Sequence, residues 1–122
     1  MISLIVDESY AYDYLSILSI KDDKKKCSQS AENFKACYNN IEAQVGIELH
    51  LKILNSNEYS DLRSVNSETF DAVDKAKTDQ VNASFIDSLN YKRYLCKKHL
   101  QDKFFDLPQK EDKIGYNKHK LW

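Results

Sequence analysis

Glycine and proline are scarce in this chain, and their scarcity limits the folds that it can adopt. The 122 residues include two glycines, Gly46 and Gly115, and one proline, Pro108, whereas average usage would supply about nine and about six. Tight turns between short strands depend on these residues. Folds that need many such turns are therefore poorly supported, and no glycine-rich phosphate-binding loop can be built.

Composition and charge place the chain among single globular domains. Hydrophobic residues make up 42% and charged residues 30% of the sequence, and 122 residues fit one domain. The formal net charge of -1 gives no overall attraction to nucleic acid or to an anionic membrane. The opening ISLIV run is stopped by Asp7 and Glu8, so it is too short for a signal peptide or a membrane span.

The cysteines and the charge distribution add two expectations. Three cysteines, Cys27, Cys37 and Cys96, form no C-x-x-C pair, which is typical of a reducing, cytoplasmic setting. Residues 1–90 carry 9 Lys and Arg against 15 Asp and Glu, whereas residues 91–122 carry 9 against 4. The positive charge is thus concentrated at the C-terminal end, and we expect a helical domain over 1–108 followed by a basic tail over 109–122.

Apolar periodicity predicts an all-α bundle of four main helices and one short helix. In the first helix, Ser9, Asp13 and Ser16 mark the polar side, and the apolar remainder includes Tyr14 and Leu15. The charged run at 21–26 is interpreted as a connector, and a break is expected within 78–84 with Asn82 or Ser84 as the next cap. The predicted helices cover 7–20, 30–54, 56–64 (the short one), about 67–77 and 85–105. Asn55 and Asn66 are the expected caps of the helices at 56–64 and at about 67–77.

Residues 47–53 leave an alternative open. Ile47, Leu49, Leu51 and Ile53 alternate with polar residues, which is also the pattern of a strand. We favour a helix that continues through Gly46, because residues 2–6 are the only candidate for a second strand. The alternative is an α+β fold with a two-stranded element formed by residues 2–6 and 47–53.

Arg93 and His99 are the one candidate catalytic pair. Arg93 falls within the apolar seam of the last helix, so its guanidinium must reach a carboxylate or a carbonyl. The R-x5-H spacing of Arg93 and His99 is similar to the R-x4-6-H motif of HEPN ribonucleases, which are small all-helical proteins. The resemblance covers seven residues and implies metal-independent RNA cleavage by these two side chains, usually across a dimer cleft.

Metal and cofactor sites are not indicated. Cys96, His99 and Asp102 follow one another at three-residue steps, but Asp102 is rotated away from the other two and a structural zinc site needs four ligands. We therefore expect no metal and no cofactor, and we interpret the cysteine as part of the core.

Aromatic and basic residues alternate near the C-terminal end and favour a binding role. Such a mixture is typical of a protein interface or of a surface that stacks on single-stranded nucleic acid. Our first hypothesis is a non-catalytic module that binds another protein or a copy of itself; the alternatives are the ribonuclease and a nucleic-acid-binding accessory protein that uses the basic C-terminal third. The predicted partner-binding residues are Tyr91, Tyr94, Lys97, Lys98 and Trp122.

Overall fold

A computed structural model describes residues 2, 4–78 and 82–105, and in this part of the chain every regular element is a helix. The all-α class is therefore confirmed. The alternative two-stranded element is wrong, because residues 47–54 are helical and residues 2 and 4–6 have no regular secondary structure. The five helices are α1 (Glu8–Lys25), α2 (Ser28–Val45), α3 (Ile47–Leu54), α4 (Asn57–Ala76) and α5 (Ala83–Phe104).

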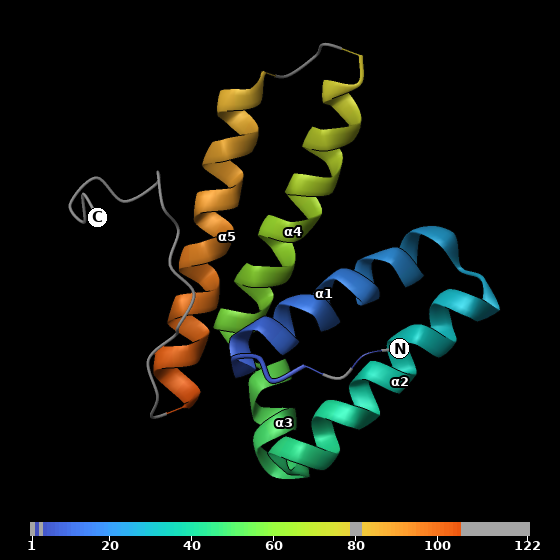
Figure 1. Ribbon diagram of the computed structural model, residues 1–122, viewed down its shortest axis with the longest axis vertical. Coiled ribbons are helices and arrows are strands. Elements are labelled where there is room, and N and C mark those ends of the chain that lie inside the picture. Colours follow the sequence, from blue (N-terminus) through green and yellow to red (C-terminus); the bar gives the residue numbers. More distant parts are fainter. Residues whose placement is uncertain (1, 3, 79–81, 106–122) are drawn as a thin grey trace.

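The helices α4 and α5 form a long pair, and α1 lies across one end of that pair (Figure 1). On its other side α1 packs against α2, and the short α3 joins α2 to α4. The core lies where α1 meets the other helices, and each of its largest apolar side chains is at most 1% exposed. These side chains are Tyr12, Leu15, Ile53, Leu62, Leu89 and Leu100.

The predicted end of the first helix and the predicted start of a helix near residue 67 are wrong. The charged run at 21–26 is not a connector, because α1 continues to Lys25 and ends at Lys26, whose φ of 49° is left-handed. The predicted start of a new helix at Asn66 is also wrong, because α4 runs unbroken from Asn57 to Ala76. Asn66 is 2% exposed, and its side chain bonds across to α1 instead of capping its own helix.

The predicted break before α5 is confirmed. The helix α4 ends at Ala76, and α5 begins at Ala83. Asn82 caps α5 as expected, with its side-chain oxygen accepting a hydrogen bond of 2.9 Å from the backbone N–H of Phe85. The cap of α4 is Ser56, whose hydroxyl accepts from the N–H of Tyr59, one residue beyond the asparagine that the sequence suggests.

Gly46 separates α2 from α3, where the sequence predicts one continuous helix. Its φ of 99° and ψ of 145° lie outside the helical region and in a part of backbone space that L side chains rarely adopt. The chain therefore bends at this residue, and α3 packs against α4 as well as α2. The short helix of the bundle is thus α3, whereas the sequence places it at 56–64.

Replacing Gly46 by alanine tests this bend, because a bent chain and a continuous helix predict opposite changes in the free energy of unfolding. In a continuous helix the change would stabilise the protein by about 1 kcal/mol. At a positive φ it should lower the free energy of unfolding by about 1–3 kcal/mol, although a Cβ there would meet no atom within 4 Å. Urea denaturation of the two proteins gives the sign, and a more stable Gly46→Ala protein would contradict the bend.

Candidate functional site

The polar stripe of α1 faces the bundle beside the buried Tyr12, Leu15 and Leu18, whereas the sequence prediction turns only the apolar residues inward. Ser9, Asp13 and Ser16 are 1%, 2% and 0% exposed. Tyr10 and Tyr14 are 50% and 53% exposed, although the periodicity assigns Tyr14 to the apolar, inward side. Because residues four apart share one face of a helix, the two tyrosines line the outer side of α1 together.

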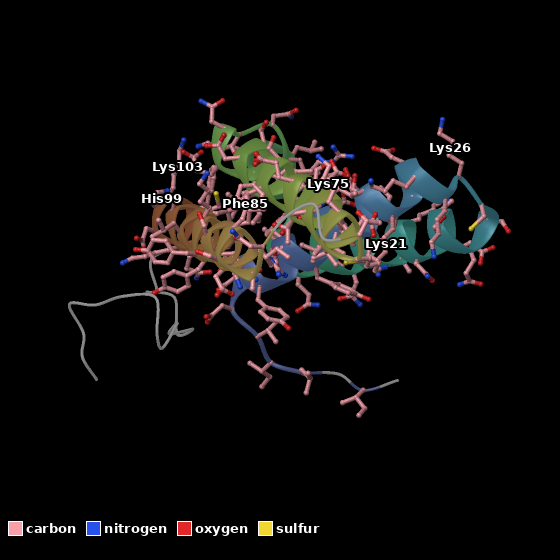
Figure 2. The ribbon with its side chains drawn as sticks, turned by 90° about the horizontal axis from the view of Figure 1, so that it is seen from above. Lys21, Lys26, Lys75, Phe85, His99 and Lys103 are labelled. Carbon is pink, nitrogen blue, oxygen red and sulfur yellow. The ribbon has the colours of Figure 1, made fainter. Side chains whose placement is uncertain are left out.

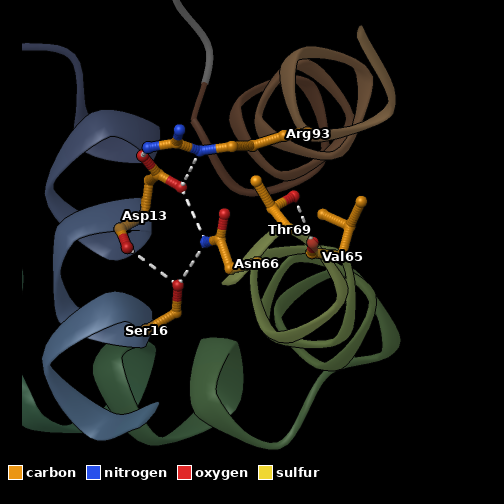
Figure 3. A network of polar contacts seen from close by, with 6 residues as sticks. All are labelled: Asp13, Ser16, Val65, Asn66, Thr69 and Arg93. Carbon is orange, nitrogen blue, oxygen red and sulfur yellow. Dashed lines mark hydrogen bonds and ion pairs between the residues drawn. The ribbon is translucent and has the colours of Figure 1, made fainter. Parts of the chain in front are cut away.

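Asp13 is the centre of a buried polar network between α1, α4 and α5 (Figure 3). Its carboxylate accepts two hydrogen bonds from Arg93, at 3.0 Å from Nε and 2.6 Å from a terminal nitrogen. The Asn66 amide donates to the same carboxylate at 2.9 Å and to the Ser16 hydroxyl at 2.7 Å. Two-pronged Arg–carboxylate pairs of this kind are among the strongest polar contacts in proteins. The network therefore fixes how the three helices meet.

A second set of polar contacts joins the first turn of α1 to the end of α5. The side-chain oxygen Oε1 of Gln101 accepts a hydrogen bond of 2.9 Å from the backbone N–H of Ser9. Its side-chain nitrogen Nε2 donates to the Glu8 carboxylate at 2.9 Å. Gln101 thus serves one of the N–H groups that every helix start leaves without an intrahelical partner. Together with the Asp13–Arg93 pair, these contacts hold the first half of α1 against α5.

His50 lies in an aromatic cluster, defined here as Tyr12, Tyr38, His50 and Tyr59. His50 is 0% exposed, and its Nδ1 lies 2.8 Å from the Tyr12 hydroxyl. The Tyr38 ring meets its imidazole edge-on at 4.5 Å between centroids. The other ring nitrogen, Nε2, has no hydrogen-bond partner among the described residues. Burial lowers the pKa of His50 from its ordinary 6.5, against the opposing effect of the Glu42 charge.

The structure does not bring Arg93 and His99 into one site. Arg93 points at α1, where it pairs with Asp13. His99 is exposed and lies beside Lys103 (Figure 2), and its charge acts on Glu58, whose pKa is lowered chiefly by the hydrogen bond from Lys103. The two side chains of the R-x5-H motif therefore serve different helix contacts in the monomer.

The predicted partner-binding residues divide into buried and exposed ones. Tyr94 and Lys97 are 8% and 4% exposed, so their predicted place on an open surface is wrong. Lys97 extends over the Tyr10 ring, 5.5 Å from its centroid, and Tyr94 stacks on the half-buried Tyr91. Lys97 thus helps to pack the α1–α5 contact, and Tyr94 packs within α5 against Tyr91.

The remaining members of that prediction are open or lie beyond the described part. Lys98 is exposed. Trp122 and the predicted tail over 109–122 lie outside the described residues, as does the predicted domain boundary at 108.

Among the described residues, the most exposed large apolar side chains lie at the start of the chain, in the run that the sequence indicates as a possible strand. The exposed fractions are 87% for Ile2, 77% for Leu4, 105% for Ile5 and 43% for Val6. Figure 2 shows these residues running away from the helices. We call the N-terminal surface the set made of Ile2, residues 4–6, Tyr10 and Tyr14.

The cysteines offer one accessible thiol, Cys27 at the start of α2. Its Sγ lies 3.2 Å from the Ser30 hydroxyl, and this hydrogen bond is the main cause of a lowered Cys27 pKa. Burial raises the pKa of Cys37 and of Cys96, which are both partly buried. No group of three or more His, Cys, Asp or Glu side chains that could hold a metal ion occurs within the described ranges.

Cys27 should therefore be the first cysteine to react with iodoacetamide at neutral pH, because the thiolate is the reactive form. Mass spectrometry of peptides after short exposures gives the order of labelling. Ser30→Ala should slow the labelling of Cys27 by a few-fold, since it removes the hydrogen bond that favours the thiolate. Equal labelling of the three thiols in the folded protein would contradict this prediction.

Comparison with known proteins returns no matching family, no matching curated protein and no matching solved structure. None of the described helices is long and apolar enough to cross a membrane.

Proposed function

We propose that this protein is a non-catalytic interaction module that binds a protein through its N-terminal surface. The observation that carries the proposal is the exposure of four apolar side chains near the start of the described chain, Ile2 and residues 4–6, beside two half-exposed tyrosines on α1. Exposed apolar groups that occur singly are ordinary, whereas a contiguous patch marks a binding surface.

Energetics support the same proposal. Burying an exposed Ile, Leu or Val side chain is worth about 1.5–3 kcal/mol, and the isolated chain gains almost none of this from Leu4 and Ile5, which are 77% and 105% exposed. Tyr10 and Tyr14 add large rings with a polar end, the kind of side chain that is enriched in protein interfaces. A partner that covers this surface would supply the missing burial.

The proposal moves the contact away from the residues that the sequence indicates. Tyr94 and Lys97 are buried, with Lys97 over the Tyr10 ring of α1, whereas Tyr10 and Tyr14 of α1 are half-exposed. The ribonuclease and nucleic-acid-binding hypotheses stay predictions. Arg93 is engaged with Asp13, so it adds no support to the ribonuclease.

The test is cross-linking in cells that make the protein. A photoreactive amino acid at position 4 should give one identified protein adduct, which Ile5→Asp abolishes while the helical circular dichroism signal stays unchanged. The matched control carries the same photoreactive group at Val73, an exposed apolar position (42%) on α4. Absence of an adduct from position 4, or the same adduct from both positions, would contradict the proposal.

A further inference from the structure

We infer that the N-terminal surface binds the same surface of a second copy of this chain, with the N-terminal segment of each copy lying on Tyr10 and Tyr14 of the other. The inference rests on the proposed function and names its partner. The two halves of the contact are an aliphatic segment, Ile2 and residues 4–6, and an aromatic helix face, Tyr10 and Tyr14.

Continuity along the chain gives this contact a two-fold arrangement. The segment leads directly through Asp7, the N-cap, into α1, so residues 2–6 and residues 10–14 flank one point of the chain. A two-fold axis near that point places residues 2–6 of each copy against residues 10–14 of the other. Such a contact is closed and self-complementary, as most homodimer interfaces are.

Five residues of extended chain span about 17 Å, whereas Tyr10 and Tyr14 are about one helical turn, or roughly 6 Å, apart along α1. Part of the segment from one copy would therefore lie on the two tyrosines of the other copy, and the rest would extend beyond them.

The chemistry of the two halves favours this occupant. Residues 2–6 have uncharged side chains, and in the isolated chain they leave their own α1 uncovered, since Ile5 is fully exposed and Tyr14 is 53% exposed. Aliphatic side chains pack well on the faces of tyrosine rings. A second copy brings an uncharged aliphatic segment to the tyrosines and receives one in exchange.

The area is enough for a weak but specific dimer. Four aliphatic side chains and two half-exposed tyrosines in each copy would remove about 800–1,500 Å² from water in total. Stable biological interfaces begin at about 1,000 Å². An interface of this size belongs to the range of weak, reversible complexes.

Sedimentation velocity of the purified full chain between about 1 and 500 μM tests the dimer. The wild type and the control Val73→Asp should dimerise alike. Ile5→Asp in the segment and Tyr14→Glu on the helix face should each weaken dimerisation by more than about 100-fold, because every substitution acts twice in the dimer. Circular dichroism and urea denaturation confirm that each variant is folded; Ile5→Asp changes a side chain outside the helices, so its fold is not at risk.

Isotope-mixed cross-linking tests the arrangement. Unlabelled protein with a photoreactive group at position 4 is mixed with ¹⁵N-labelled wild type, and the adduct is mapped by mass spectrometry. A light-to-heavy link to the 10–14 region supports the inference. A link within one copy, or a dimer that survives Ile5→Asp, overturns it. A strict monomer that still gives the in-cell adduct with a different protein overturns the dimer but keeps the proposed function, whereas a monomer without any adduct removes both.

Discussion

Replacing Asp13 by alanine should lower the free energy of unfolding by about 3 kcal/mol. Removing one partner of a buried ion pair costs about 3–5 kcal/mol, because the other charge stays without compensation. The Arg93 side chain is 30% exposed, so its guanidinium regains some water and the loss lies at the lower end. The Asn66 amide loses one of its two acceptors as well. Urea denaturation at pH 7 measures the change.

The protein has another Arg–Asp pair, which joins α1 to α4 and provides the matched control. Arg63 bonds Asp23, and their side chains are 37% and 70% exposed. Asp23→Ala should cost less than about 1 kcal/mol, since water screens exposed pairs. The double variant Asp13→Leu, Arg93→Met should recover much of the stability that Asp13→Ala loses, because it removes both buried charges. If Asp13→Ala and Asp23→Ala cost the same, the network has no special role in stability.

Apolar periodicity and the positions of helix-capping and helix-breaking residues were enough to predict that the chain is helical and roughly where most helices lie. The long helix α5 and the break before it follow from an apolar seam without Gly or Pro and from a capping asparagine, and both depend only on neighbours along the chain. Asn66 misled the prediction because its amide has two possible roles. The same side chain can cap a helix or bond a distant one, and only the approach of Asp13 and Ser16 decides between them.

The burial of the polar stripe of α1 has the same origin. A stripe of Ser9, Asp13 and Ser16 is ordinarily the solvent side of a helix. Here it is buried, because residues 53 and 80 positions further along the chain supply an amide and a guanidinium to Asp13. Sequence analysis required a carboxylate or carbonyl for Arg93 and was right about that need, but spacing alone could not single out Asp13 among the acidic residues.

The sequence predicted a binding surface of aromatic residues but not which residues form it. Aromatic residues beside basic ones indicated a binding surface, but the structure buries Tyr94 and Lys97 and exposes Tyr10 and Tyr14 instead. Which side of a helix stays open depends on where its neighbours pack. The exposure of Leu4 and Ile5 likewise has no signal in the sequence, since the same run would suit a buried strand.

Acidification should weaken the fold through His50 before most carboxylates are protonated. Burial lowers the pKa of His50 from 6.5, so the folded state favours the neutral ring, and its contribution to stability is complete above pH 6.5. As the pH falls below 6.5, the unfolded chain takes up a proton that the folded chain resists. The free energy of unfolding then falls as the pH falls, by at most about 1.4 kcal/mol per pH unit.

The acid sensitivity has a structural reason, which is that a protonated His50 ring carries an N–H at both ring nitrogens. A charged ring donates from both nitrogens; Nδ1 has the Tyr12 hydroxyl at 2.8 Å, but Nε2 has no acceptor among the described residues. An N–H that is buried without an acceptor is costly. The fold must therefore open around α3 or keep the ring neutral.

Urea denaturation at several pH values between 7.5 and 5 measures how the free energy of unfolding depends on pH. The same His-to-Asn change at two positions shows which histidine causes that dependence. His50→Asn removes the titrating ring, and although it lowers stability at every pH, the slope between pH 6.5 and 5 should become shallow. His99→Asn makes the same change at an exposed histidine of α5 and should leave the wild-type slope in place. If the pH dependence persists in His50→Asn, or disappears in His99→Asn, another group causes the acid sensitivity and the prediction for His50 is wrong.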